Sequence, residues 1–223
     1  MSVFVLKVLA IVAMLLDHIA AVFLSYGTMP YMLMRGFGRI AFPIFCFLIV
    51  EGYFHTRDVK KYMFRLAGFA LISEIPFDLC FYHKFFYWEH QNVFFTLLVG
   101  LVAICAIDKI RKHFSASYVQ GLVLQFAVII LAMIVAWFLR TDYQMLGILI
   151  IMAFYVNRDN MVQIALSLFV ITLCLGNSIQ FYSLFALFPL CLYNGEKGPS
   201  MRYVFYVFYP AHLLILYAVS SLS

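Results

Sequence analysis

Apolar residues fill most of the chain, in nine runs that short polar breaks separate. The runs are 3–24, 36–54, 62–80, 92–108, 119–138, 144–156, 161–175, 181–193 and 202–220. A helix needs about 20 apolar residues to cross the hydrocarbon core of a bilayer. The sixth to eighth runs are shorter, which favours half-helices that line a cavity or helices extended by polar neighbours. The pattern predicts an all-α, polytopic membrane bundle of about nine helices, some short or kinked, with eight or ten as alternatives.

The composition agrees with an integral membrane protein. Hydrophobic residues make up 66% of the chain and charged residues 11%, and the mean hydropathy is +1.00. A soluble domain carries about 25% charged residues. No polar stretch is long enough for a separate soluble domain, so residues 1–223 are predicted to form a single membrane domain. The net charge of +5 is not gathered into a patch of the kind that binds nucleic acid, and no metal site is expected.

The five cysteines are scattered through apolar runs without CxxC spacing, so we expect them to be small buried apolar residues.

Lysine and arginine are distributed unevenly between the two sides of the membrane that nine crossings create. One side carries the N-terminus and the even-numbered breaks, with Lys7, Arg57, Lys60, Lys61, Arg65, Lys109, Arg111, Lys112, Arg158, Lys197 and Arg202. The other side carries Arg35, Arg39, Lys84 and Arg140. Because basic loops stay in the cytoplasm, this bias predicts a cytoplasmic N-terminus.

An aspartate and a histidine stand side by side inside the first apolar run. A charge at such a depth costs at least about 2.5 kcal/mol, so Asp17 and His18 indicate a functional site. At about 1.5 Å per residue, Asp17 lies roughly 21 Å from the inner end of its helix, and Glu74, Asp78 and His212 fall between about 15 and 24 Å. Polar residues from several helices are therefore predicted to share one depth, from the midplane to the outer third.

The spacing of the charges indicates which of them face each other. Arg35 and Arg39 are four residues apart, as are Glu74 and Asp78, so each pair shares one helix face. Adjacent helical residues do not face each other, so Asp17 is expected to pair with Arg35 or Arg39 and not with His18. A carboxylate of the third run is then a candidate partner for His18. An interhelical salt-bridge network is the structural alternative for the whole set, and a packing role is the alternative for His212.

Two breaks on the basic side carry features of phosphate-binding loops. They are HTRDVKKYMFRL, residues 55–66, and YNGEKGPSMR, residues 193–202. Asn-Gly and Lys-Gly-Pro favour tight turns with exposed backbone N–H groups, and such turns beside basic residues suit phosphate. Topology or lipid contact is the alternative explanation for these basic residues.

Several motifs in succession resemble one family. They are LKVLAIVAMLLDHI (6–19), RGFGRIAFPIFCFLIVEGYFHT (35–56), KYMFRLAGFALISEIPFDL (61–79), QNVFFTLLVGL (91–101), LYNGEKG and FYVFYPAHLLIL. This order resembles the TraX family, whose founding activity is acetylation of the F-pilin N-terminus. The resemblance covers nearly the whole chain and is thin between 109 and 180. The TraX family in turn resembles membrane acyltransferases that use acetyl-CoA, in which a histidine on an early helix lies at the site.

The resemblance implies a membrane acetyltransferase in the bacterial inner membrane, with acetyl-CoA entering from the cytoplasm. His18, Asp17, Arg35 and Arg39 are the expected catalytic group, with His18 as general base or transient acetyl carrier. The residues expected to bind the acceptor are Glu74, Asp78, Gln91, Asn92, Tyr209 and His212. The residues expected to bind acetyl-CoA are Lys61, Arg65, Asn194, Gly195, Lys197 and Gly198.

The acceptor and the partners stay open at this point. The acceptor is an amine or hydroxyl on a small molecule or a peptide, membrane lipids surround the chain, and the oligomeric state is unassigned, a homodimer being possible. A proton-coupled transporter also places Asp, Glu and His at mid-depth beside kinked helices. A non-catalytic scaffold is a third class. Stabilisation by CoA separates the enzyme from the transporter, and a scaffold tolerates neutral substitutions of the polar residues.

Overall fold

The computed structural model describes residues 1–114, 118–200 and 202–222, and the side chain of Arg202 lies outside the description. The described residues form helices and no strand, apart from one isolated bridge between Gln91 and Thr141. The helices are α1 (Val3–Phe23), α2 (Met29–Gly38), α3 (Ala41–His55), α4 (Val59–Tyr82), α5 (Val93–His113), α6 (Tyr118–Phe138), α7 (Gln144–Val156), α8 (Met161–Leu175), the 3₁₀ helix η1 (Ser178–Ala186), α9 (Leu187–Cys191) and α10 (Arg202–Ser220). The predicted all-α bundle is confirmed.

The second and eighth apolar runs are each divided into two helices, which corrects the prediction of one helix per run. α2 begins at Met29, well before the expected start at residue 36, and ends where Arg39 and Ile40 leave regular helix. Pro43 explains the break, because proline has no N–H for the carbonyl four residues earlier and its ring clashes with that carbonyl, here that of Arg39. Pro43 itself is in the first turn of α3, where its missing N–H costs little.

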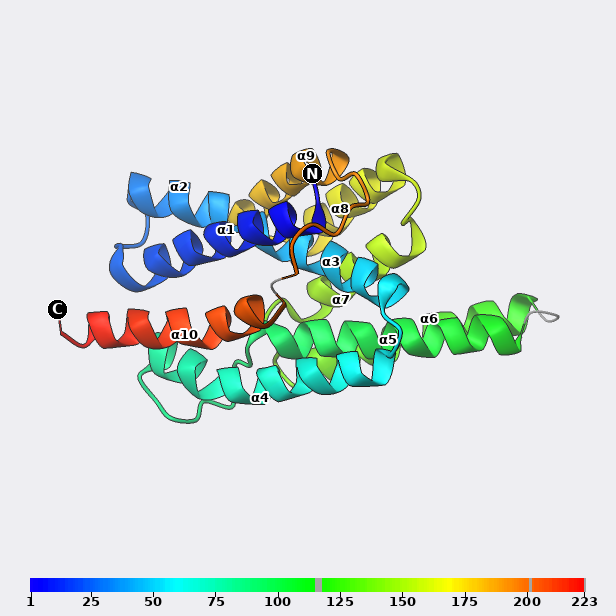
Figure 1. Cartoon of the computed structure of the whole chain (residues 1–223), viewed down its shortest axis with the longest axis horizontal. Helices are drawn as coiled ribbons and strands as arrows, with labels where there is room; N and C mark the ends of the chain where they lie inside the picture. The colour runs from blue at the N-terminus through cyan, green and yellow to red at the C-terminus, as the bar shows by residue number, and fades with distance from the viewer. Residues whose placement is uncertain (115–117, 201, 223) are drawn as a thin grey trace.

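Two helices lie at the centre of the bundle. In α3, ten of the fifteen residues are buried, and α3 packs against α1, α5, α7 and η1. α7 is buried along Gly147–Tyr155 apart from Leu149 and packs against α3, α5, α6 and α8. Figure 1 shows α1, α4 and α10 running roughly parallel to the long axis beside this centre, with α5 and α6 extending at one end. The apolar core is therefore shared by several helices and leaves room between α1, α3, α4 and α10.

The membrane character of the fold is visible in helix length and in the exposed surface. Five helical stretches in the described residues are long and apolar enough to cross a bilayer: 3–23, 29–55, 93–113, 118–138 and 203–220. α6 is buried only at Gly121, Ala132 and Ala136. Val128, Ile129 and Met133 are half-buried against the core, and most of its other apolar side chains are exposed. α7 and α8 have 13 and 15 residues, which confirms that these segments are short.

The polar breaks gather at two ends, in the alternation that the nine runs predicted. At one end, the backbone of 194–197 hydrogen-bonds to that of residues 1–4, and Arg158 and Tyr193 both reach Glu51. At the other end, the segment 89–91 meets 140–142 through backbone bonds and the pair Arg140–Glu89. The basic end thus contains the N-terminus and the 193–200 loop. The assignment of that end to the cytoplasm stays a prediction.

Candidate functional site

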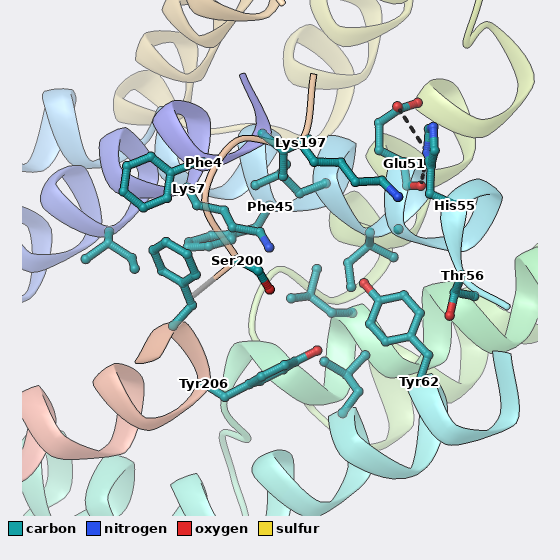
Figure 2. A pocket seen from close by; sticks show the side chains of 18 of the residues that line it. Phe4, Lys7, Phe45, Glu51, His55, Thr56, Tyr62, Lys197, Ser200 and Tyr206 are labelled. Atoms are coloured by element: carbon teal, nitrogen blue, oxygen red, sulfur yellow. Dashed lines mark hydrogen bonds and ion pairs between the residues drawn. The ribbon is translucent and has the colours of Figure 1, made fainter. Parts of the chain in front are cut away.

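Three adjoining chambers run through the space between the helices. The first, which we call the basic chamber, has a volume of about 450 Å³ and opens at the end that carries the N-terminus. Its polar lining includes Lys7, His55, Tyr62, Arg65, Lys197 and Ser200. Figure 2 shows Lys7, Tyr62, Lys197 and Tyr206 directed toward the middle of this space from α1, α4, the 193–200 loop and α10.

The second and third chambers lead from there to the opposite end. The histidine chamber, about 330 Å³, contains Asp17, His18, Arg35, Arg39 and Tyr82 in its wall. The loop chamber, about 420 Å³, is formed mainly by residues 141–146 and 175–177, with Gln180. The basic and histidine chambers share Met14, Phe45, Val93 and Tyr209. The histidine and loop chambers share Arg39, His90, Asp142 and Tyr143. The three spaces are therefore neighbours that share walls.

Asp17 is held by both arginines, as the spacing predicted. One of its carboxylate oxygens, Oδ2, accepts from Arg35 Nη1 and from Arg39 Nη2, the latter at 2.5 Å. The contact needs a close approach of α2 to α1, and Gly38 provides it. A Cβ added to Gly38 would overlap the Asp17 side chain. One carboxylate between two guanidinium groups leaves a net positive charge beside the histidine chamber.

His18 is paired with His212, which settles the partner that the sequence left open. His18 Nδ1 lies 2.8 Å from His212 Nε2, and the two rings are within 6° of parallel. His212 Nδ1 lies 2.8 Å from the carbonyl oxygen of Phe208, which can only accept a hydrogen bond. Therefore Nδ1 of His212 carries a proton and, in the neutral ring, Nε2 accepts from Nδ1–H of His18. This arrangement leaves the lone pair of His18 on Nε2, the atom that is not used in the pair.

Known proteins support the resemblance that the motifs indicated. The model of the family described as TraX protein matches residues 2–220 of this chain. The chain belongs to the TraX family. The probable fimbrial assembly protein FimC, serogroup H1, of Dichelobacter nodosus is 33% identical over 238 residues, covering 96% of this chain and 94% of that protein. No solved structure matches the chain significantly.

In this TraX chain, only part of the expected acetyl-CoA group lines the basic chamber. Arg65, Gly195, Lys197 and Gly198 line it. Lys61 does not: it is 79% exposed and pairs with Asp58 at 3.4 Å. Asn194 does not line it either, because its side chain closes the turn through bonds with Glu196. Gly195 and Gly198 have φ angles of +78° and +65°, which explains why glycine is placed at both positions.

Four residues expected to bind the acceptor line none of the three chambers. Asn92 caps α5 and donates to Glu74 and to the carbonyl of Ala70, and Asp78 accepts from the backbone N–H of Tyr87. Gln91 bonds through its backbone to residues 140 and 142. Glu74, Asp78, Gln91 and Asn92 therefore fix the α4–α5 connection, whereas Tyr209 and His212 lie at or beside His18. Neither Glu74 nor Asp78 is the partner of His18, which corrects that expectation.

Sequence reasoning missed a carboxylate at each end of the series. Glu51, in the wall of the basic chamber, is buried and bonds to Arg158 at 2.7 Å and Tyr193 at 3.0 Å. Burial, followed by the charge of Glu51, raises the pKa of Tyr193 to about 12. At the other end Asp142 lies 3.5 Å from Nε2 of His90. Burial lowers the pKa of His90, but Asp142 outweighs that effect, with help from Glu74 and Asp78, and the pKa is raised above its ordinary value.

Within the described ranges, no three His, Cys, Asp or Glu side chains gather as metal ligands would. The chambers bring together the His18–His212 pair, two arginines on one carboxylate and a basic mouth.

Proposed function

We propose that this TraX protein is a membrane-embedded acetyltransferase, which moves acetyl from acetyl-CoA at the basic chamber to an amine or hydroxyl acceptor. The observation that carries the proposal is that the basic chamber adjoins the chamber of His18 across a shared wall of Met14, Phe45, Val93 and Tyr209. The FimC relative is named for fimbrial assembly. That name supports a role in pilus assembly, and a protein or peptide N-terminus is then one candidate acceptor.

The basic chamber has the charges and the walls that acetyl-CoA requires. Arg65 lines the chamber with its guanidinium carbon 5.8 Å from the centre of the Tyr62 ring, which places a cation in the wall where a phosphate would bind. Lys197 extends over the chamber in Figure 2. Gly195 has open space where a Cβ would stand, so the backbone of this turn can approach a phosphate closely. Phe4, Phe45 and Phe205 supply an apolar path for a long thioester arm.

His18 is the group that removes a proton from the acceptor. Its Nε2 carries the lone pair, because Nδ1–H is used in the bond to His212. A protonated His18 would still donate from Nδ1 to His212, so the pair is unchanged in geometry by protonation. General-base catalysis of this kind raises the rate of the chemical step by about 10²–10⁴-fold. The proton taken from the acceptor is then returned to the departing thiolate of CoA, which leaves His18 neutral.

The arginines stabilise the negative charge that develops on the thioester oxygen. Arg35 and Arg39 each use one nitrogen on Asp17. The remaining N–H groups of Arg39, in the wall of the histidine chamber, are held in place by that contact and need no reorganisation. Asp17 is therefore a positioning residue for the arginines and not a base.

Thermal stabilisation by CoA tests the proposal against the transporter alternative. A ligand at 100 times its Kd stabilises the folded state by about 2.7 kcal/mol. We expect CoA to raise the Tm of the purified protein and pantetheine, which lacks the phosphates, to raise it less. In Lys197→Ala, the shift caused by CoA should be smaller and the shift caused by pantetheine unchanged. A Tm that is the same with and without saturating CoA would contradict the proposed function.

A further inference from the structure

The basic and histidine chambers meet at a wall of four side chains, Met14, Phe45, Val93 and Tyr209. In the proposed reaction the thioester must cross this wall, because the phosphates of acetyl-CoA are held in the basic chamber and His18 lies in the other. Tyr209 has the largest side chain of the four and is only 3% exposed. Its ring therefore fills space between the two chambers.

The ring of Tyr209 is packed edge-on against the rings of three neighbours. Its centroid lies 4.9 Å from that of Phe94, 5.6 Å from that of His212 and 6.2 Å from that of His18, with planes inclined by 74°, 70° and 72°. Its hydroxyl is directed at the backbone N–H of Val93, the first residue of α5. The first N–H groups of a helix have no partner within it, so the hydroxyl provides one of them with an acceptor. These contacts hold the ring across the wall.

The helices that carry the wall differ in how freely they can shift. Phe45 belongs to the central helix α3, and Met14 belongs to α1, which packs against α2, α3 and α10. Tyr209 belongs to α10, which packs mainly on α4 and α1 and is exposed along much of its length. Pro210, inside α10, has no N–H for the carbonyl of Tyr206, and a proline at such a place allows a helix to bend. α10 is therefore the part of the wall that can move most readily.

We propose that Tyr209 is the gate between the two chambers and thereby the residue that selects the acceptor over water. This inference rests on the proposed acetyltransferase function. With the ring in place, a thioester in the basic chamber is kept away from His18. When α10 shifts and the ring swings aside, the thioester reaches His18. Because the ring lines the histidine chamber as well, an acceptor bound there contacts it, so the position of the gate depends on the acceptor.

The competing reaction that the gate prevents is hydrolysis of the thioester. The histidine chamber adjoins the loop chamber, where His90 and Asp142 are partly exposed, so water has access to His18 from that side. His18 can take a proton from water as it does from an acceptor. The water oxygen then bonds to the carbonyl carbon, and the C–S bond breaks with its electron pair on sulfur. One proton is returned through His18 to the CoA thiolate, and the other leaves with acetic acid. Without the gate, acetyl-CoA is hydrolysed whether or not an acceptor is bound.

Thiol labelling tests the barrier without any need for catalysis. In a variant free of native cysteines, Leu97→Cys places a thiol in the wall of the basic chamber. A small anionic methanethiosulfonate is applied to the face of the membrane on which Glu89→Cys is labelled. We expect no reaction of Leu97→Cys with Tyr209 present, and reaction in Tyr209→Ala and in the milder Tyr209→Leu. Tyr217→Ala is the control, because Tyr217 is on α10 but lines none of the three chambers. Equal labelling with and without the Tyr209 side chain would overturn the gate.

Hydrolysis of acetyl-CoA in the absence of an acceptor tests the selection against water. Tyr209→Ala should release CoA about tenfold or more faster than the wild type, and adding His18→Ala should remove that gain, because His18 activates the water. A purely structural role of Tyr209 would lower transfer without raising hydrolysis. Hydrolysis by Tyr209→Ala at the wild-type rate, in a protein whose wild type transfers acetyl, would overturn the selection. If Tyr209→Ala admits the reagent but neither protein cleaves acetyl-CoA, the barrier stands and the acetyltransferase function is contradicted.

Discussion

His18 Nδ1 and His212 Nε2 meet at 2.8 Å although 194 residues separate them in the chain. The carbonyl of Phe208 fixes the proton on the other nitrogen of His212, so the pair determines which nitrogen of His18 is basic. A histidine whose partner defines its tautomer is a common arrangement for a catalytic base.

Removing His212 should therefore lower turnover without affecting acetyl-CoA binding. We expect His212→Phe to reduce kcat about 10–100-fold with an unchanged KM for acetyl-CoA, the range found when a partner that orients a functional histidine is removed. His212→Gln should retain more activity, because its amide oxygen can accept from His18. Steady-state kinetics measure both, and His113→Gln, an exposed histidine at the end of α5, is the control. An equal loss of kcat in all three variants would contradict the claim that His212 sets the tautomer of His18.

The approach of α2 to α1 should depend on Gly38. Because an added Cβ would overlap Asp17, Gly38→Ala should destabilise the protein by about 1–3 kcal/mol and displace the arginines. Gly68 of α4 has nothing within 4 Å of its added Cβ, so Gly68→Ala should be neutral or stabilise by up to about 1 kcal/mol. Thermal unfolding of the two variants in the same detergent provides the comparison. If Gly38→Ala unfolds at the wild-type temperature and keeps full activity, the close approach of α2 to α1 at this position is contradicted.

Substitutions of Arg65 and Lys197, which line the basic chamber, should weaken acetyl-CoA binding, whereas substitution of Lys61 should not. Arg65→Gln and Lys197→Ala should raise the KM for acetyl-CoA and make it more sensitive to salt, since each removes a proposed phosphate contact. Lys61→Ala is the matched control, because Lys61 pairs with Asp58 outside the chamber. Kinetics at two ionic strengths test this. A loss of kcat at unchanged KM in Arg65→Gln and Lys197→Ala would reject the phosphate contacts.

The distribution of basic residues predicts the orientation of the protein in the membrane. In a variant without the native cysteines, a cysteine at Glu89 should react with a membrane-impermeant reagent from outside, and a cysteine at Asp159 only after the cytoplasmic face is opened. Both positions are exposed, so access depends on the side and not on burial. The reverse pattern of labelling would invert the topology and place the basic chamber outside.

Titration of His90 checks the environment of the loop chamber. Its pKa is raised in the folded protein by Asp142, so the pair contributes stability that is fully present below the unfolded pKa and is lost as pH rises through the folded value. Asp142→Asn should lower the pKa of His90, as followed by NMR of labelled histidine. The stability difference between wild type and Asp142→Asn should shrink toward alkaline pH. An unchanged titration would show that the two side chains do not interact.

The contact of Asp17 with Arg35 and Arg39 could be predicted from local spacing, because four-residue separation on a helix fixes a common face. The His18–His212 pair could not, since no local period relates the first helix to the last. Asp142 was missed for a related reason: it lies in the short break RTDYQ, where a polar residue normally serves a turn, and only packing brings it to His90. Glu51, in contrast, stands within an apolar run, so the signal that selected Asp17 was present for it as well.

The helix boundaries show the same division between local and long-range effects. Pro43 explains the break after Arg39 by a rule that operates within one turn. The division of the eighth run into η1 and α9 follows the same rule, because Pro189 is the third residue of α9, as Pro43 is of α3. The packing of η1 against α2, α3 and α8, in contrast, is a long-range effect. The side chain of Tyr182, for example, would meet a Cβ at Gly36 at 3.2 Å. Such tertiary contacts are not visible in an apolar pattern.

The most direct test of the central claim is acetyl transfer by purified wild-type protein and by His18→Ala, with radiolabelled acetyl-CoA and a panel of amines, hydroxyl compounds and short peptides. The wild-type protein should transfer label to at least one acceptor. The His18→Ala protein should still be stabilised by CoA but lose transfer by about 10²-fold or more, because the proposed general base is gone. Transfer at the wild-type rate by His18→Ala would contradict the account.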